Sequence, residues 1–248
     1  MSKLAVFDLD GTLYDGNIVA GFLNHHREHK VNRLHLYTYF ASHTPLIPLW
    51  RAGLLAEERM RELWARNLSW AITGMSEQTG NSCFEWITEH YVGPRIRQDV
   101  HDIALQHSRD GCRVILVSGT PAPLLEVIAQ RLGIQESIGT PVKMSNGTYN
   151  GKVELPTCQG EGKVTRLRSF LGEDINSVDW KAGYAYADSF TDKPLLRVFG
   201  HPVAVYPDPK LAAEAKRNNW AILGDIREPK ARKLRDGKTA EKHNGGLL

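Results

Sequence analysis

From Pro94 onward this chain alternates short β-branched runs with amphipathic helical segments, and this alternation restricts the fold more than any other feature. Strands are expected at residues 113–117, 182–187 and 202–206, and helices at 100–109, 121–132, 162–171, 193–199 and 209–218. A hairpin is expected at residues 142–153, with Asn-Gly turns. Such alternation is typical of a mostly parallel sheet covered by helices on both faces. We therefore predict an α/β fold.

A buried strand, Lys3 to Leu9, precedes a long helical block that interrupts this pattern. Residues 17–91 show helical spacing in segments at 18–30, 32–41, 55–71 and 76–90. We predict a core of residues 1–16 and 92–224 and a helical cap domain of residues 17–91 inserted after the first strand. The chain has 21 aromatic residues, and 11 of them lie between Tyr14 and Tyr91. The core of a helical bundle is favoured over an apolar substrate pocket or a lipid-facing surface.

The composition indicates a globular protein, because 248 residues with 42% hydrophobic content can bury a sizeable core. Cys83, Cys112 and Cys158 are widely separated, which favours reduced thiols over a disulfide framework. No apolar run approaches the roughly 20 residues of a membrane span. The strand at Lys3 leaves no room for a signal peptide. The expected location is cytoplasmic.

Residues 225–248 carry a surplus of basic side chains that equals the net charge of +3 of the whole chain. With few large apolar groups, this segment is predicted to be a basic, disordered tail. Electrostatic contact with nucleic acid or anionic lipid is the alternative interpretation. A solvated end is favoured, and no nucleic-acid partner is expected.

Four separate segments carry groups that phosphate chemistry needs: residues 8–12 (DLDGT), residues 118–120 (SGT), Lys163 and residues 188–192 (DSFTD). Asp8 and Asp188 each lie at the end of an expected strand, where open α/β sheets bind their ligands. Carboxylates that converge there need compensation by a cation or by protons. Oxygen ligands without nearby His or Cys indicate Mg²⁺.

Each group has an expected role in phosphoryl transfer. Asp8 is the expected nucleophile, which forms an aspartyl-phosphate, and Asp10 is the expected general acid and base. Ser118 and Lys163 would bind the phosphate, with free backbone N–H groups at the following helix start. Asp188 would ligate the metal directly. Asp192 would hold the metal's waters or orient Lys163, or would cap a helix beside Pro194.

Each segment also has a plainer interpretation when it is taken alone. The first is a turn after a strand, the second is a capped helix start, and Lys163 is a solvated lysine. Only the combination favours a phosphate site. His25, His26 and His29 include an i, i+4 pair that could bind a metal. With no third ligand evident, a solvated helix face is the favoured interpretation.

These motifs together resemble the haloacid dehalogenase (HAD) superfamily of phosphohydrolases, subfamily IB, the branch of the phosphoserine phosphatases. The first to fourth motifs correspond to residues 7–13, residues 117–120, Lys163 and residues 187–192. The resemblance covers residues 1 to about 222. It implies a Rossmann-like sheet with a helical, C1-type cap after the first strand.

The resemblance also implies specific ligands. Asp8, the backbone carbonyl of Asp10 and Asp188 would bind Mg²⁺, and Ser118, Gly119 and Lys163 would bind the phosphate. An acidic residue at position 10 marks the phosphatases of the superfamily. Thr191 stands where many relatives have Asn, and with Asp192 it is expected just behind these ligands.

The substrate is less constrained. Asn17 occupies the place of a Glu that holds the substrate amine in phosphoserine phosphatases, and a neutral side chain loses that charge-assisted contact. The cap arginines, Arg51, Arg59, Arg61 and Arg66, have no assigned role. The predicted function is Mg²⁺-dependent hydrolysis of a small or lipid-like phosphate ester. The alternatives are a phosphoserine phosphatase, a phosphotransferase or a non-catalytic module that binds phosphate ligands. Peripheral membrane contact and the oligomeric state stay open.

Overall fold

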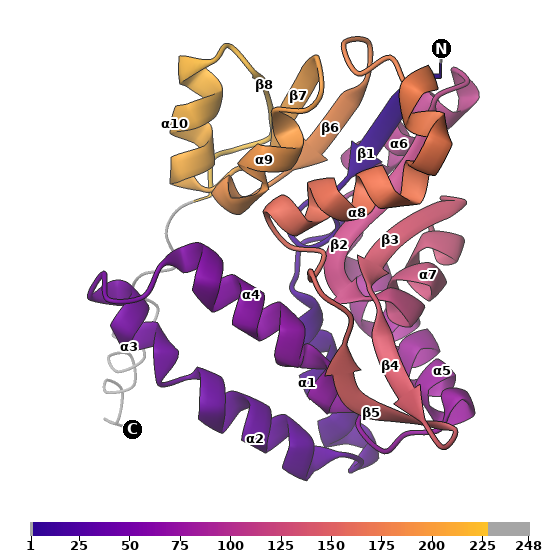
Figure 1. Ribbon diagram of the computed structural model, residues 1–248, viewed down its shortest axis with the longest axis vertical. Coiled ribbons are helices and arrows are strands. Elements are labelled where there is room, and N and C mark those ends of the chain that lie inside the picture. The colour runs from indigo at the N-terminus through magenta and orange to yellow at the C-terminus, as the bar shows by residue number, and fades with distance from the viewer. Residues whose placement is uncertain (1, 228–248) are drawn as a thin grey trace, which may run out of the picture.

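A six-stranded parallel sheet forms the centre of the computed structural model, which describes residues 2–227 (Figure 1). The strand order is β3-β2-β1-β6-β7-β8, and every neighbouring pair is parallel. The strands are β1 (Leu4–Phe7), β2 (Arg113–Pro121), β3 (Glu136–Thr140), β6 (Tyr184–Ala187), β7 (His201–Val205) and β8 (Ala221–Leu223). The predicted α/β class with a mostly parallel sheet is confirmed.

Helices cover both faces of this sheet because its strands are apolar on both sides. Along β1, Leu4 and Val6 face one apolar cluster and Ala5 and Phe7 face the other. One face packs against α6 (Gln98–Arg109) and α7 (Ala122–Arg131). The other packs against α8 (Glu161–Leu171), α9 (Lys193–Leu196) and α10 (Pro209–Arg217).

A helical region follows β1, as expected for a C1-type cap. It contains α1 (Ile18–His29), α2 (Arg33–His43), α3 (Leu46–Arg51), α4 (Glu57–Asn67) and α5 (Glu77–Trp86). In Figure 1 it lies at the end of the molecule toward which β1 points. Buried aromatic residues of this region, such as Phe22 and Tyr39, join the same apolar cluster as Phe7 of the sheet. These aromatic residues therefore form a packed core, as the bundle interpretation predicted.

Several boundaries differ from the prediction. The helix expected at 55–71 ends at Asn67 and continues as a 3-10 helix, η1 (Leu68–Ile72). The helix expected at 76–90 becomes a π-helix, η2 (Ile87–Val92), and then a 3-10 turn, η3 (Gly93–Arg95). The 3-10 helix η4 (Gly172–Ser177) follows α8. At these changes of helix type the chain continues along the same helix axis, so the spacing of apolar residues alone does not detect them.

One α-helix and two strands of the described residues were not predicted: α3, β3 and β8. The helix α3 was missed because Pro45 and Pro48 looked like breakers, but Pro45 precedes the helix and Pro48 lies in its first turn, where no N–H partner is lost. The strand β3 has a mixed polar sequence, and β8 is a three-residue edge strand. Short strands of this kind carry too little pattern to be read from sequence.

The predicted hairpin is present as β4 (Val142–Ser145) and β5 (Thr148–Val153), and it ties the helical region to the core. The N–H of Gly74 donates to the carbonyl of Tyr149 at 2.8 Å, and the hydroxyl of Ser69 donates to the carbonyl of Gly151 at 2.8 Å. On the opposite side, Lys210 of α10 pairs with Glu57 of α4 at 2.6 Å. These polar contacts attach the helical region to the core at two places, in addition to the apolar cluster that the two parts share.

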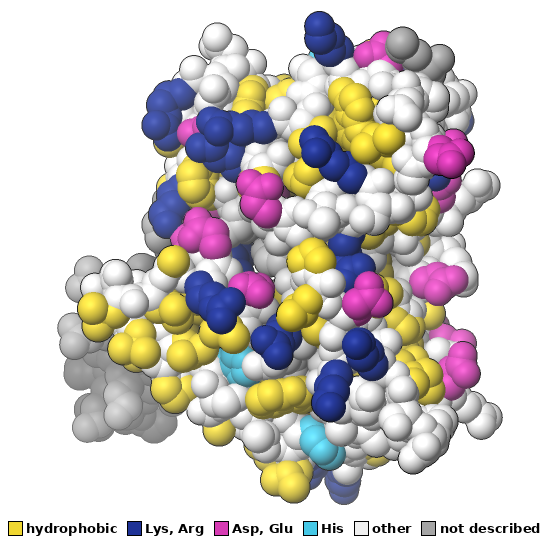
Figure 2. Space-filling view, viewed as in Figure 1, with side chains coloured by type: hydrophobic (Ala, Val, Ile, Leu, Met, Phe, Trp, Pro, Cys, Tyr) yellow, Lys and Arg dark blue, Asp and Glu magenta, His cyan; other side chains and the backbone are white. Residues whose placement is uncertain are grey.

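The helical region also has the most exposed large apolar side chains. Leu34 is 76% exposed and Leu54 is 78% exposed. Figure 2 shows hydrophobic side chains gathered over the α3 end of this region, beside Lys and Arg side chains. Among residues 2–227, no helix combines the length and the apolar character needed to cross a bilayer. Cys83, Cys112 and Cys158 are free thiols.

Candidate active site

The predicted phosphate-site residues lie at one rim of the sheet, at the carboxyl ends of neighbouring strands. Asp8 follows β1, Asp188 follows β6, and Ser118 lies near the end of β2, which pairs with β1. Lys163 is in the first turn of α8. Carboxylate oxygens of Asp8, Asp188 and Asp192 lie within 4.8 Å of one another. We call this group, with Asp10 and Lys163, the rim site.

Lys163 is the centre of a buried ion-pair network. Its ammonium lies 2.5 Å from Oδ1 of Asp8 and 2.6 Å from Oδ1 of Asp192, and the residue is 1% exposed. Burial alone would lower the pKa of Lys163, but the charges of Asp192 and Asp8 outweigh it and hold the pKa above its usual range. The interpretation of Lys163 as a solvated lysine is wrong, because no lysine this buried keeps its charge without such partners.

Asp10 has a different environment from Asp8, although only Leu9 separates them. The hydroxyl of Tyr14 donates to Asp10 Oδ1 at 2.6 Å, and the N–H of Ile18 donates to both carboxylate oxygens at 3.2 Å. Burial raises the pKa of Asp10 to about 7; the bond from Tyr14 opposes this shift, and the charge of Asp8 adds to it. Asp10 can therefore hold or release a proton near neutral pH.

Asp188 has a cationic partner that the sequence did not reveal. Arg227 forms an ion pair with the Asp188 carboxylate and donates to the Asp188 carbonyl at 2.9 Å. Burial, followed by the charge of Asp8, raises the pKa of Asp188, and Arg227 counteracts this. Arg227 belongs to the segment predicted as a basic tail. Residues 225–227 of that segment are described, and residues 228–248 lie outside the described part.

The donor set of the rim site fits a hard divalent cation. The three converging carboxylates offer only oxygen ligands, they are buried, and burial also raises the pKa of Asp192. A raised carboxyl pKa means that the charged form lacks compensation, which a bound cation would supply. This group of carboxylates could therefore surround such an ion, with Asp8 and Asp188 as direct ligands and Asp192 beside them, in contact with Lys163.

The Ser118 segment lies in the last part of β2, where the pairing register with β3 shifts between Val117 and Pro121. The Ser118 and Thr120 hydroxyl oxygens lie 3.0 Å apart, and the N–H of Thr120 donates to Ser118 Oγ at 3.2 Å. A Cβ at Gly119 would lie 2.8 Å from Oε1 of Gln159, so a larger residue there would displace this flexible side chain. The strand β2 continues through Pro121, and the next helix begins at Ala122, one residue later than predicted.

Other residues hold the rim site in place, although they were not predicted as site residues. Asp208 accepts hydrogen bonds from the N–H of Phe190 and of Leu211, both at 2.8 Å, so it joins the 188–192 segment to the start of α10. Within that segment, the Thr191 hydroxyl lies 3.1 Å from the Ser189 hydroxyl. The Asp208-Pro209 pair is a helix-start signal that could have indicated the cap of α10, whereas nothing in the sequence indicates its second contact.

The helical region contributes one arginine near the rim site. Of the four cap arginines named above, Arg61 is the one whose charge acts on Asp192, where it opposes the effect of burial on the pKa. Arg61 lies in α4 and pairs with Glu57 at 3.1 Å. Asn17 is exposed and caps α1, because its side-chain oxygen accepts from the N–H of Val19 at 2.8 Å.

The histidines of α1 do not form a solvated face. His26 is fully buried and His25 is 6% exposed, while His29 is exposed. The interpretation of all three as a solvated face is therefore wrong for His25 and His26. Both rings pack under α5, whose Cys83 lies 3.3 Å from Nδ1 of His25.

Comparisons with known proteins agree with this geometry. Residues 5–197 match the family model for haloacid dehalogenase-like hydrolases. A phosphoserine phosphatase from Mycobacterium tuberculosis is 28% identical over 225 residues, which cover 90% of this chain and 70% of the relative. A histidinol-phosphatase from Neisseria meningitidis is 34% identical over 137 residues, covering 54% of this chain and 61% of the relative.

Solved structures share the fold. A protein of unknown function from Bordetella pertussis has a TM-score of 0.75 at 24% identity, covering 90% of this chain and 99% of the other. A phosphoserine phosphatase in its apo form has a TM-score of 0.60 at 14% identity, covering 92% of this chain and 94% of the other. At these identities the similarity concerns the fold alone.

Proposed function

This chain belongs to the haloacid dehalogenase-like hydrolase family, and from that premise we propose that it is a Mg²⁺-dependent phosphomonoesterase that acts through a phospho-Asp8 intermediate. Membership of the family makes it a phosphatase-type hydrolase. The metal, the intermediate and the substrate class are the parts that we propose.

One observation carries the proposal: two aspartates, Asp8 and Asp10, are separated only by Leu9 but have different partners. Asp8 Oδ1 lies 2.5 Å from the Lys163 ammonium, so the proposed nucleophile is paired directly with a cation. Asp10 instead accepts hydrogen bonds from Tyr14 and Ile18, which orient its carboxyl group, and burial raises its pKa to about 7. Neighbouring acids whose environments separate their protonation states are typical of acid–base catalysis.

The rest of the rim site supplies the other steps. The Lys163 ammonium and the Ser118 hydroxyl would bind the phosphate oxygens, while Asp8 attacks phosphorus. Asp10 would protonate the leaving oxygen and then take the proton from the water that hydrolyses the intermediate. Asp8, the Asp10 carbonyl and Asp188 would hold Mg²⁺, which supplies positive charge to the phosphate oxygens. Asp192 would keep Lys163 in position through their 2.6 Å contact.

The proposal is tested by hydrolysis of p-nitrophenyl phosphate. Turnover is expected with Mg²⁺, to be lost with EDTA and to return with excess Mg²⁺. Asp8→Asn should lower kcat by more than about 10³-fold, because it removes the nucleophile at nearly constant shape. The thermal unfolding midpoint of the variant serves as the control for folding. Metal-independent turnover, or turnover retained by Asp8→Asn, would contradict the proposal.

For the substrate, we favour a small phosphate ester that presents an anionic group to α4. Arg61 is the cap cation whose charge reaches the rim site, as its effect on Asp192 indicates. Asn17 is used as a helix cap and carries no charge for an ammonium group. Recognition of phosphoserine through its amine is therefore not supported here, although one relative has that name.

Substitution of Arg61 tests this assignment. Arg61→Gln should raise KM about tenfold for phosphate esters with a carboxylate in the leaving group, because a charge-assisted contact is lost. Hydrolysis of a neutral alkyl phosphate should change by less than about twofold. Arg59→Gln is the matched control, because Arg59 is 59% exposed and pairs only with Glu62. Equal effects of Arg61→Gln on both substrates would contradict the assignment.

A further inference from the structure

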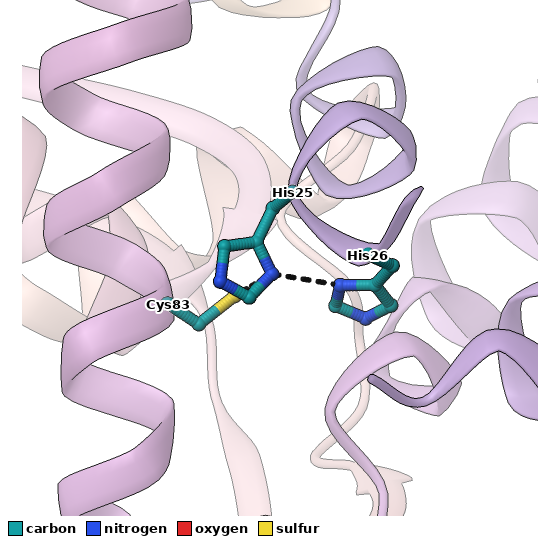
Figure 3. A group of neighbouring side chains, drawn as sticks. All are labelled: His25, His26 and Cys83. Carbon is teal, nitrogen blue, oxygen red and sulfur yellow. Dashed lines mark hydrogen bonds between the residues drawn. The ribbon is translucent and has the colours of Figure 1, made fainter. Parts of the chain in front are cut away.

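A second buried cluster of potential ligand atoms lies in the helical region. It consists of His25 and His26 from α1 and Cys83 from α5, and it is shown in Figure 3. The His25 ring lies between the Cys83 sulfur and the His26 ring. We call these three side chains the cap cluster. None of them has a role in the proposed phosphatase chemistry.

The three ligand atoms are already close to the spacing of a metal site. Nδ1 of His25 lies 3.0 Å from Nδ1 of His26 and 3.3 Å from Sγ of Cys83, and all three atoms lie within 4.8 Å of one another. Tetrahedral Zn²⁺, with bonds of about 2.0 Å to nitrogen and about 2.3 Å to sulfur, separates its ligand atoms by about 3.3–3.6 Å. Only small side-chain shifts separate the cap cluster from this geometry.

A hydrogen bond made by Nε2 of His26 determines which nitrogen of that ring carries the proton. The other nitrogen, Nδ1, therefore has a free electron pair that faces the cap cluster. Nε2 of His26 lies 2.7 Å from the carbonyl oxygen of Ala71, which can only accept, so Nε2 must carry the proton. Nδ1 of neutral His26 is then an acceptor that faces His25 and Cys83. A histidine ligand that donates its other N–H to a carbonyl is the usual arrangement at metal sites.

Burial keeps both imidazoles neutral. It lowers the pKa of His25 to about 4, helped by the neighbouring His26 and His29, and it also lowers the pKa of His26. Neutral imidazoles are the form that binds metals. Burial raises the pKa of the Cys83 thiol to about 12, so binding must break the S–H bond and release its proton to solvent. Nδ1 of His25 donates to Nδ1 of His26 in the metal-free protein, so on binding the His25 proton must move to Nε2 of the same ring.

We propose that His25, His26 and Cys83 bind one thiophilic metal ion of the class of Zn²⁺ and Cu⁺, which fastens α1 to α5. The donor set is two nitrogens and one sulfur, and no carboxylate of residues 2–227 belongs to this group. Such donors select Zn²⁺ or Cu⁺ over Mg²⁺. One thiolate neutralises Cu⁺ completely, whereas Zn²⁺ keeps one positive charge and takes a fourth ligand. The nearest candidate is His29, whose ring centroid is 4.5 Å from that of His25.

Metal binding here would act on the rim site through α1. The N-terminal N–H of this helix, from Ile18, donates to Asp10, and the other end of the helix carries His25 and His26. A metal that joins α1 to α5 would restrict the movement of the helix that positions the proposed general acid. The inference about the metal does not depend on the phosphatase proposal.

The test is metal binding by the whole protein with excess Mg²⁺ present, so that the rim site is occupied. Zn²⁺ and, under anaerobic conditions, Cu⁺ are added separately, and Co²⁺ serves as the spectroscopic probe for the Zn²⁺ site. We expect about one equivalent of Zn²⁺ or Cu⁺ per chain and a thiolate-to-Co²⁺ charge-transfer absorption. The competition between the two ions identifies the preferred one.

Cys83→Ala should weaken binding at least about 100-fold and abolish the charge-transfer absorption, because it removes the thiolate. Cys112→Ala is the matched control, because Cys112 is a free thiol outside the cap cluster, and it should bind like the unaltered protein. If Cys83→Ala fails to fold, the charge-transfer absorption of the unaltered protein still decides the matter. Binding of neither ion, or full binding by Cys83→Ala, would overturn the proposal.

Discussion

The rim site and the cap cluster are both buried groups of titratable side chains, yet they are stabilised in different ways. The rim site consists of charged groups, in which Lys163 and Arg227 compensate carboxylates such as Asp8. The cap cluster consists of neutral groups that share hydrogen bonds, with His25 in the middle. The difference indicates that the rim site is stabilised by pairing of opposite charges. The cap cluster is stabilised by hydrogen bonds, which require that donors and acceptors face one another.

Lys163→Met should have the largest effect on stability and gives the sharpest test of this difference. The ammonium of Lys163 contacts Asp8 and Asp192, so its loss leaves buried carboxylates uncompensated. We expect the free energy of unfolding in EDTA at pH 7.5 to fall by about 3–5 kcal/mol. Urea unfolding measures this loss. Lys210→Met is the matched control, with an expected loss below about 1 kcal/mol, because Lys210 is 63% exposed.

The sign of the pH effect in Lys163→Met follows from the carboxylates. Burial raises the pKa of Asp192 in the folded state, and removal of the ammonium takes away a charge that lowers it, so protonation of Asp192 favours folding. The loss should therefore be smaller at pH 5.5 than at pH 7.5. Cys83→Ala in metal-free protein removes no charge, and should cost about 1 kcal/mol at both values. If the loss in the free energy of unfolding depended equally on pH in the two variants, the proposed difference between the charged and the neutral site would be wrong.

The pH dependence of catalysis is the next test, because only the rim site is expected to titrate near neutrality. Burial raises the pKa of Asp10 to about 7 and lowers that of His25 to about 4. Asp10 must be protonated to donate to the leaving oxygen, and its protonated fraction falls as pH rises. For an alkyl phosphate, kcat/KM should therefore fall about tenfold per pH unit above this pKa.

An aryl phosphate is the control for this profile, because its leaving group needs little help from a proton. Its kcat/KM should change much less over the same range. Asp10→Asn should lower the rate with the alkyl phosphate far more than with the aryl phosphate. Identical pH profiles for the two substrates would mean that a group other than Asp8 and Asp10 causes the fall of kcat/KM at high pH.

The rim site was predictable from sequence because topology brings its members together. Parallel strands end at the same edge of a sheet, so Asp8, Ser118 and Asp188 could be placed at one rim before any contact was known. The same reasoning gave the alternation of helices and strands. Lys163 was included because its ammonium could bind a phosphate, and it proved to be buried beside Asp8.

The contacts between helices could not be predicted in this way. Cys83 is 58 residues from His25 along the chain, and its approach depends on how α1 and α5 pack. The spacing of apolar residues does not reveal how two helices pack against each other. Cys83 was therefore not recognised from the sequence as a third ligand beside His25 and His26. Arg227 was missed for a related reason: a composition argument assigned residues 225–248 to a tail, although its first residues return to Asp188.

Asn17 gives the smallest expected effect and tests the link between the two sites. It caps α1, the helix that starts at the Asp10 contact and ends at the cap cluster. Asn17→Ala should lower the free energy of unfolding by about 1 kcal/mol, because a helix N–H loses its partner. Asn17→Asp should restore this stability, since a carboxylate caps equally well and favours the positive helix end.

If α1 links the sites, Asn17→Ala should act on both of them. Fraying of the first turn would loosen the bond from the Ile18 N–H to Asp10, which normally opposes the rise in the pKa of that carboxyl group. In Asn17→Ala, the fall of kcat/KM for the alkyl phosphate should therefore begin at a higher pH. In Asn17→Asp, it should begin at a pH closer to that of the unaltered protein. Added Zn²⁺ or Cu⁺ should recover part of the stability lost in Asn17→Ala, because a metal at His25 and His26 holds the other end of the helix. Loss of stability without either change would mean that the two sites share a helix but act independently.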